Sequence, residues 1–434
     1  MYRSILKELN NWKLEEQRKV LLIRGARQVG KTYIVREFGQ SFEYFIEVNF
    51  DETAAVHSFF EGNLDPDLIC ENLSAYYGIP VKDHKTLVFF DEVQACQGAL
   101  RALRYFYEKR PGLHLVATGS LLEFAFRELA SFGVGRIRSL FMYSMSFDEF
   151  LIALEEEQLI KIKQRASIAI PLNNAFHEKL LLYYSRYILV GGMPAVVKSY
   201  IADKDLLKCQ DAQNDIIISL QSDFPKYKKR IPSIRIFDVF KSVAYQSGNK
   251  FKHVHAGPDY SSRQVKDVLE LLILAGLVHP VYHTSGQGLP LGASVNTKKA
   301  KMLFFDTGLM FRILGLKLSD ALFPNDFNAL NRGNMAEVCA GLELIKASSP
   351  YEKPELYYWQ REARSSNAEV DYIIQVNNNI VPIEVKAGSR GQMQSLYMFM
   401  NERKIPYGIR TSLENFSSFS NIRVIPLYAI QNII

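Results

Sequence analysis

The stretch Lys19-Val20-Leu21-Leu22-Ile23-Arg24, followed directly by Gly25-Ala26-Arg27-Gln28-Val29-Gly30-Lys31-Thr32, decides the fold of the first part of the chain. The first six residues predict a buried strand, and the next eight fit G-x-x-x-x-G-K-T, a loop that joins a strand to a helix. The glycines let backbone N–H groups surround phosphates at the helix N-terminus. We therefore predict that residues 25–32 bind ATP, with Lys31 on the β- and γ-phosphates and Thr32 on Mg²⁺.

Two carboxylates follow a second apolar strand, at the end of Leu87-Val88-Phe89-Phe90-Asp91-Glu92. Downstream of a phosphate-binding loop, this pattern predicts that Asp91 organises the magnesium ion through water and that Glu92 polarises the attacking water. A third strand, residues 114–118, ends in Gly119-Ser120. We expect Ser120 to sense the γ-phosphate, and ordinary turn chemistry is the alternative.

The order of elements predicts several domains in the 434 residues. Apolar strands at 19–24, 44–50, 85–91 and 114–118 alternate with helical stretches, which indicates an α/β domain with a parallel sheet over residues 1–155. Long amphipathic patterns then predict a helical lid over 156–232.

Residues 233–297 have the order helix, helix, strand and Gly-rich turn, which is typical of a winged helix. Ser261 and Ser262 lie where an N-cap belongs. One face of the second helix is apolar, through Val265, Val268, Leu269 and Leu272. Arg263 and Lys266 should therefore face outward.

Charge is unevenly distributed along the chain. The net charge is +6, but the segment from Lys226 to Lys301 holds thirteen Lys or Arg against four Asp or Glu. This basic segment predicts an anionic partner, DNA first, bound by Arg263, Lys266 and the tract Lys226–Arg230, with His279, His283 and the turn 286–292 as a wing. A solvated face or a protein-binding winged helix is the alternative. The histidines lack the spacing of metal ligands.

A second cluster of charged residues lies near the C-terminus. Asp371 ends Glu369-Val370-Asp371, and Glu384-Val385-Lys386 closes the next strand. Glu384 and Lys386 share one face of their strand, and Asp371 approaches from the neighbouring strand. Glu384 and Asp371, completed by Glu337 of the preceding helix, would bind magnesium, with Lys386 positioning water for phosphodiester cleavage. The pattern resembles the PD-(D/E)xK restriction-endonuclease-like fold over residues 298–434, although Val370 replaces the proline, and a catalytically silent binding platform is the alternative.

Nearly the whole chain resembles one family. The motifs GARQVGKT, LVFFDEVQ, ATGS, Gly135-Arg136 and SMSFDEF within residues 19–150 look like the ATPase domain of AAA-superfamily proteins that carry a C-terminal domain called DUF4143. Gly191-Gly192-Met193-Pro194 and Phe305-Asp306-Thr307-Gly308-Leu309 match as well. The resemblance implies ATP binding and hydrolysis. It also implies an arginine donated by a neighbouring subunit of a homo-oligomer: Arg136 is the candidate, Arg127 and Arg138 are rivals, and an ordinary surface arginine is the alternative.

Composition and cysteine usage indicate a cytoplasmic protein. The four cysteines are scattered singly, and the first 19 residues alternate charged and apolar side chains, unlike a signal peptide. The longest apolar stretch, residues 271–278, is far shorter than the roughly 20 residues that cross a bilayer. We therefore expect no membrane association.

Together these patterns predict a magnesium-dependent ATPase that couples ATP hydrolysis to nucleic-acid binding, with cleavage at Asp371, Glu384 and Lys386 as an additional activity. The first alternative is an ATP-gated adaptor that recognises another protein through its winged helix and has a silent nuclease-like domain. The second is a DNA-binding regulator in which ATP sets affinity.

Overall fold

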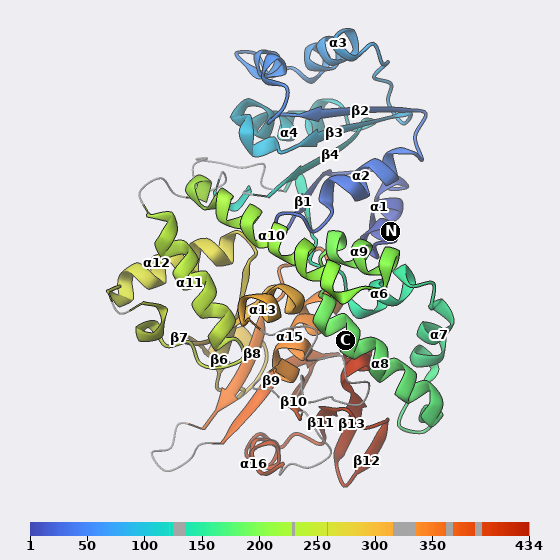
Figure 1. Ribbon diagram of the computed structural model, residues 1–434. Coiled ribbons are helices and arrows are strands. Elements are labelled where there is room, and N and C mark those ends of the chain that lie inside the picture. The colour runs from blue at the N-terminus through green and yellow to red at the C-terminus, as the bar shows by residue number, and fades with distance from the viewer. Residues whose placement is uncertain are drawn as a thin grey trace. The chain divides into compact units, whose positions relative to one another are not determined.

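The computed structural model describes residues 1–120, 122–124, 135–227, 231–257, 259–315, 335–361, 368–386 and 393–433. The chain forms two compact units (Figure 1). Unit 1 comprises Met1–Tyr143 together with the short segments Leu274–Gly276 and Ser349–Lys353. Unit 2 comprises the rest of the chain, from Ser144 onward.

Unit 1 contains a parallel sheet, as the sequence predicted, with a fifth strand in addition to the four expected. Its strands are β1 (Val20–Arg24), β2 (Tyr44–Asn49), β3 (Thr86–Asp91), β4 (His114–Gly119) and β5 (Ile137–Phe141). Their order in space is β2-β3-β4-β1-β5, and every neighbouring pair is parallel. Because β4 separates β1 from β3, the carboxyl ends of these three strands lie side by side at one edge of the sheet.

Helices connect these strands. They are α1 (Ile5–Lys13), α2 (Lys31–Gly39), α3 (Pro66–Tyr77) and α4 (Gln97–Lys109), with short 3-10 turns η1 (Ala54–Phe60) and η2 (Val93–Ala95). Asp65 caps α3 by accepting a hydrogen bond from the Asp67 amide, and Gly78 ends the helix with a positive φ. Leu100 and Leu103 of α4 pack in one core with Val88 and Phe90 of β3. This burial fixes the strand that ends in Asp91.

The middle of the chain is helical, as expected after residue 155. Unit 2 begins with α6 (Phe147–Ala153), α7 (Glu157–Arg165), α8 (Asn174–Val190), α9 (Pro194–Asp203), α10 (Leu206–Tyr227), α11 (Ser233–Gln246) and α12 (Ser262–Leu274). Ser261 caps α12: its hydroxyl accepts from the Gln264 amide, and the Gln264 side chain accepts from the Ser261 amide. The four apolar residues predicted to face inward on α12 are buried.

Two strands follow α12 and belong to a larger sheet than a winged helix requires. β6 (Val278–Thr284) and β7 (Val295–Phe304) are antiparallel, and β6 also pairs with β8 (Leu356–Gln360) in parallel. Residue 298, where we expected a domain boundary, lies inside β7. The winged helix over 233–297 and the four-domain division remain predictions.

The C-terminal part completes an eight-stranded mixed sheet in the order β12-β13-β11-β10-β9-β8-β6-β7. The further strands are β9 (Glu369–Val376), β10 (Asn379–Val385), β11 (Gly408–Ser412), β12 (Ser417–Phe419) and β13 (Ile422–Pro426). Helix α15 (Met335–Ala347) precedes β8, and α16 (Gln394–Arg403) connects β10 to β11. β9 is antiparallel to both of its neighbours, β8 and β10, whereas β10 and β11 are parallel. The expected α/β character of this region is confirmed.

Two motifs that carried the family resemblance meet in the core of unit 2. Asp306 caps α13 (Thr307–Ile313) through the Leu309 amide at 3.1 Å, and its other carboxylate oxygen accepts from the Gly192 amide at 2.8 Å. A Cβ on Gly191 would clash with the Asp306 carboxylate, and one on Gly192 would clash with the carbonyl oxygen of Met145. These glycines therefore allow the close approach of three chain segments.

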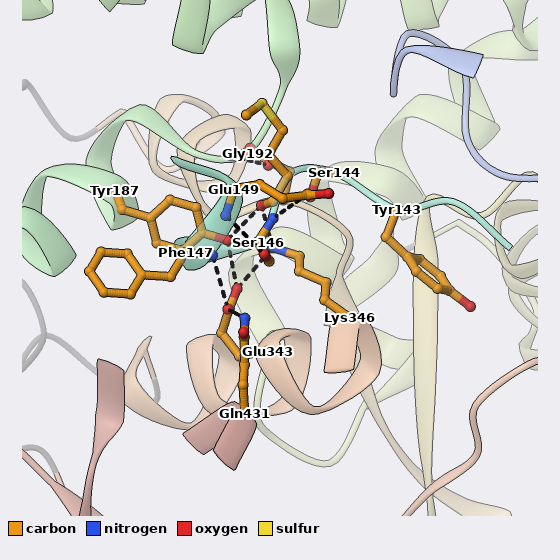
Figure 2. A network of polar contacts seen from close by, with 12 residues as sticks. Tyr143, Ser144, Ser146, Phe147, Glu149, Tyr187, Gly192, Glu343, Lys346 and Gln431 are labelled. Atoms are coloured by element: carbon orange, nitrogen blue, oxygen red, sulfur yellow. Dashed lines mark hydrogen bonds and ion pairs between the residues drawn. The ribbon is translucent and has the colours of Figure 1, made fainter. Parts of the chain in front are cut away.

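A buried polar network extends this contact, as Figure 2 shows. Glu343 and Lys346 of α15 point toward Tyr187 of α8, whose hydroxyl lies 2.6 Å from both Glu343 Oε1 and Lys346 Nζ. Glu343 Oε2 accepts from the Phe147 amide at 3.1 Å. Lys346 Nζ also donates to the carbonyl oxygen of Met145. The network thus connects the first residues of unit 2 to helices α8 and α15 through hydrogen bonds.

Candidate nucleotide site and C-terminal carboxylate cluster

The predicted phosphate-binding loop lies between β1 and α2, where its backbone requires glycine. Gly25, Gln28 and Gly30 have positive φ values of 152°, 64° and 97°. A Cβ on Gly25 would clash with the carbonyl oxygen of Met142, the residue that follows β5. Gly30 immediately precedes the first turn of α2, so free backbone N–H groups of that turn are available to phosphate oxygens.

Lys31 is buried and turned back onto the loop. Its Nζ donates to the carbonyl oxygens of Gly25 at 3.0 Å and Ala26 at 2.8 Å. Burial lowers the pKa of Lys31 to about 8, against the opposing charges of Glu92 and Asp91. An incoming phosphate chain would supply stronger, charged acceptors than these carbonyls.

Asp91 links the loop to two strands of the sheet. Its Oδ2 accepts from Thr32 Oγ1 at 2.8 Å, and its Oδ1 accepts from Thr118 Oγ1 and from the Glu92 amide. Burial raises the pKa of Asp91, while the hydrogen bonds from Thr118 and Thr32 lower it. A hydroxyl and a carboxylate beside a phosphate loop are oxygen ligands that suit Mg²⁺, so these residues fit the ion. Thr118 was not singled out from the sequence.

The Glu92 carboxylate has different side-chain partners from the Asp91 carboxylate. Its backbone has a left-handed φ of 49°. Its Oε2 accepts from Gln94 Nε2 at 2.5 Å and lies 3.4 Å from Ser120 Oγ. The structure therefore brings Glu92 and Ser120 together, and it adds Gln94. A Cβ on Gly119 would clash with the Gln94 side chain, so the glycine before Ser120 makes room for it.

The arginine candidates lie elsewhere in unit 1. Arg136 forms an ion pair with Glu108 at the end of α4, and Arg138 pairs with Glu15 at 2.5 Å. Because Ile137 pairs with Val20, Arg136 lies at the start of β5, the edge opposite the phosphate loop. The structure therefore does not bring Arg136 to the nucleotide site of its own chain. Arg127 lies outside the described residues.

In the C-terminal sheet, Asp371 and Glu384 are neighbours on adjacent strands. The β9–β10 pairing runs to Ile383 opposite Tyr372, which places Asp371 and Glu384 side by side. Asp371 Oδ2 accepts from the Val385 amide at 2.8 Å, and Glu384 Oε1 accepts from Lys386 Nζ at 2.7 Å. Burial and the nearby Asp371 raise the pKa of Glu384 to about 8, and burial raises that of Asp371.

Glu337 has a different partner from the one we expected. Its Oε1 accepts from Lys301 Nζ at 2.6 Å, and the same ammonium lies 2.6 Å from Glu369 Oε1. Among the described residues, no three Asp, Glu, His or Cys side chains are arranged to hold a metal ion. The predicted ligand set of Glu337, Asp371 and Glu384 therefore does not fit a metal, because Lys301 engages Glu337. Lys301 was counted with the basic segment.

Several basic side chains of the segment from Lys226 to Lys301 are buried or pair with acidic side chains of the same chain. Lys226 pairs with Asp223 at 3.3 Å, Lys250 pairs with Glu369 at 2.8 Å, and Lys301 is buried. Arg263, Lys266, Lys298 and Lys299 are exposed, while residues 228–230 lie outside the described part of the chain. His283, expected in a wing, is buried against the carbonyl of Gln360. Of these bases, Arg263 and Lys266 lie on the exposed face of α12, where an anionic partner can reach them.

Three segments of the chain match known families. Residues 17–151 match a family described as an AAA domain, residues 182–320 match a domain of unknown function called DUF8612, and residues 332–430 match DUF4143. The resemblance to AAA and DUF4143 proteins is thus confirmed for the first and last segments. The segment that holds the phosphate-binding loop is of the AAA class of nucleotide-binding domains. Comparison with curated proteins gave no match.

Several solved structures are similar in part. A Walker-type ATPase of Pyrococcus abyssi is 15% identical, with 72% of this chain and 95% of that chain covered and a TM-score of 0.43. Drosophila ORC bound to DNA is 14% identical, with 71% and 84% covered and a TM-score of 0.28. Cdc6p of Pyrobaculum aerophilum is 11% identical, with 73% and 93% covered and a TM-score of 0.26.

Hydropathy along the helices bears on the expected lack of membrane association. Of the helices in the described ranges, none combines the length and the apolar character needed to cross a bilayer.

Proposed function

We propose that the protein is a magnesium-dependent ATPase. The observation that carries this proposal is the 2.8 Å hydrogen bond from Thr32, the first-turn hydroxyl after the phosphate loop, to Asp91 at the end of β3. It brings the two predicted magnesium-binding residues together at one edge of a parallel sheet. Glu92 follows directly and is held by a side-chain amide, which supports its assignment as the general base.

In the proposed reaction the loop amides and Lys31 hold the β- and γ-phosphates, while Thr32 and Asp91 hold the ion. Bound Mg²⁺ would neutralise charge that develops on the phosphate oxygens. Glu92 accepts the proton of the attacking water, and Ser120, 3.4 Å from Glu92, reports the state of the γ-phosphate. Moving Lys31 from the loop carbonyls to phosphate oxygens couples binding to a local rearrangement.

Steady-state ATP hydrolysis by the purified chain tests this proposal. We expect hydrolysis that requires Mg²⁺ and is lost in Lys31→Ala, whereas Glu92→Gln should still bind ATP but turn it over at least about 100-fold more slowly. Arg101→Ala, at an exposed position of α4, is the matched control. Hydrolysis that persists in Lys31→Ala would exclude this site.

A nucleic-acid partner is the second candidate, favoured by the exposed bases Arg263 and Lys266 on α12. Asp267 and Glu270 are exposed on the same helix, so a phosphate-directed contact would use only part of its surface. Stimulation of ATP hydrolysis by double-stranded DNA, reduced in Arg263→Ala/Lys266→Ala, supports this function. Hydrolysis indifferent to DNA, with no DNA binding, favours the ATP-gated protein adaptor instead.

For the C-terminal region we propose the restriction-endonuclease-like fold without deriving a cleavage step. The order α15-β8-β9-β10-α16-β11, with Asp371 and Glu384 adjacent and Lys386 beside Glu384, supports the fold. The metal-ligand set is incomplete because Glu337 is engaged by Lys301. A cytoplasmic location and a homo-oligomer in which Arg136 completes a neighbour's site also remain proposals, and sedimentation with and without ATP tests the oligomer.

A further inference from the structure

In unit 2, basic residues that we expected to bind nucleic acid form ion pairs with acidic residues of the region that we expected to bind magnesium. Lys250 and Lys301 belong to the segment expected to bind nucleic acid, whereas Glu337, Glu369 and Asp371 belong to the region expected to bind magnesium. Lys301 Nζ lies 2.6 Å from Glu337 and 2.6 Å from Glu369, and 3.9 Å from Asp371 Oδ1. Lys250 reaches the other oxygen of Glu369 at 2.8 Å.

Lys301 reaches this position from the edge strand of the sheet. It lies on β7, and its side chain is only 2% exposed. Its ammonium also lies 5.1 Å from the centre of the Tyr358 ring on β8. Lys250 and Lys301 are paired across an isolated antiparallel bridge, so two like charges lie together against Glu369. The Glu369 carboxylate, which contacts both ammonium groups, offsets the repulsion between them.

We propose that Lys301 takes the place of a divalent cation in this carboxylate cluster, so that the C-terminal sheet folds without a metal. This inference rests on the nuclease-like arrangement proposed above. It adds that the centre of the cluster is occupied by the Lys301 ammonium and not by a metal ion. The ammonium joins β7 to α15 and β9, where a nuclease of this architecture would have to place an ion.

The remaining carboxylate oxygens leave little for a metal to bind. Asp371 Oδ2 accepts from the Val385 amide, and Glu384 Oε1 accepts from Lys386. Within the described chain, Glu384 Oε2 is the buried oxygen of this cluster that has no hydrogen-bond partner. Even with Asp371 Oδ1, which lies 3.9 Å from the Lys301 ammonium, and the second oxygen of Glu337, these few oxygens fall short of the six ligands that Mg²⁺ takes. A second cation would also lie close to the Lys301 ammonium and be repelled by it.

Titration of the nucleotide-free, full-length protein with Mn²⁺, followed by electron paramagnetic resonance, tests the proposal. Without nucleotide, the phosphate loop lacks the phosphates that complete its own metal site. We expect the wild type to bind Mn²⁺ no more tightly than about 1 mM and to show no rise in melting temperature with Mn²⁺. Lys301→Met should melt at a lower temperature in EDTA, bind Mn²⁺ at least about tenfold more tightly, and regain stability with Mn²⁺.

Lys386→Met is the matched control, because Lys386 contacts one carboxylate and is 27% exposed. It should gain no Mn²⁺ dependence. If Lys301→Met does not fold, the double variant Lys301→Met/Glu337→Gln removes one charge of each sign and should fold without binding Mn²⁺. Stoichiometric Mn²⁺ binding by the wild type that disappears in Asp371→Asn overturns the proposal, and so does a Lys301→Met protein that ignores Mn²⁺. These measurements involve no ATP, so they succeed or fail independently of the ATPase assignment.

Discussion

Thr32 Oγ1 and Asp91 Oδ2 lie 2.8 Å apart, so the first turn of α2 and the last residue of β3 share one hydrogen bond. Thr32→Val keeps the shape of the side chain and removes the donor and magnesium ligand. We expect ATP hydrolysis to fall about 100-fold and the Mg²⁺ concentration for half-maximal rate to rise about tenfold. Thr53→Val, in unit 1 outside this site, is the control. An unchanged magnesium dependence would remove Thr32 from the metal site.

The lowered pKa of Lys31 predicts how the affinity for ATP depends on pH. Its pKa is lowered to about 8 by burial, from an ordinary value of 10.5. Above about pH 8 Lys31 is deprotonated in the folded protein, whereas in the unfolded chain it keeps its proton up to about pH 10.5. Burial of the charged ammonium therefore destabilises the folded state below pH 8, and this destabilisation disappears as the pH rises toward 10.5. ATP requires the ammonium form. We expect the Kd for ATP at saturating Mg²⁺ to be about tenfold higher at pH 9 than at pH 7.

The variant Lys31→Arg distinguishes the titration of Lys31 from that of other groups, because a guanidinium stays charged between pH 7 and 9. Whatever its absolute affinity, the variant should show a flat profile between pH 7 and 9 in isothermal titration calorimetry. A wild-type profile that is equally flat would contradict the assignment of the titration to Lys31.

Gln94 donates to Glu92 and so should act on turnover through that carboxylate. We expect Gln94→Ala to lower kcat roughly tenfold with little change in KM, because substrate contacts remain while the base is less well oriented. Gln40→Ala, at an exposed position after α2, should leave both constants unchanged. A rise in KM without loss of kcat would mean that Gln94 supports nucleotide binding instead.

Gly192 offers a test of the packing in unit 2. A Cβ there would meet the carbonyl oxygen of Met145. We expect Gly192→Ala to destabilise unit 2 by about 2–3 kcal/mol, seen as a lower melting temperature. Gly288→Ala is the control, because a Cβ at that position has open space around it. Equal melting temperatures for the two variants would show that the backbone adjusts freely.

Local patterns predicted the parts of the protein that depend on neighbouring residues. The loop from Gly25 to Thr32 is bounded by a strand and a helix, as its sequence pattern requires, and the strand that ends in Asp91 is buried on both faces. Glu92 and Ser120 are brought together because β3 and β4 are parallel neighbours. The alternation of strands and helices predicts that these strands are parallel, but it does not predict their order in the sheet.

The same local patterns do not predict which residues far apart in the sequence form ion pairs with each other. Lys301 and Glu337 are 36 positions apart, and Lys250 and Glu369 are further apart still. The count of charges in the segment predicted that its lysines bind an anionic partner, whereas in the fold Lys250 and Lys301 pair with the carboxylates of Glu369 and Glu337. The β6–β7 hairpin likewise looked like a wing, because local pattern does not reveal that β6 pairs with β8 on its other edge.

Unit 1, which holds the phosphate-binding loop, is discontinuous in sequence, and this limits how the protein can be divided. Phe141 of β5 donates its backbone amide to the carbonyl of Pro350 at 2.7 Å, and the Tyr351 hydroxyl donates to Glu8 at 2.9 Å. Gly276 packs beside Ala26 of the phosphate loop. A fragment that ended near residue 150 would carry the whole phosphate-binding motif and lose all three contacts. Unit 1 is therefore completed by chain that is synthesised more than a hundred residues after its last strand.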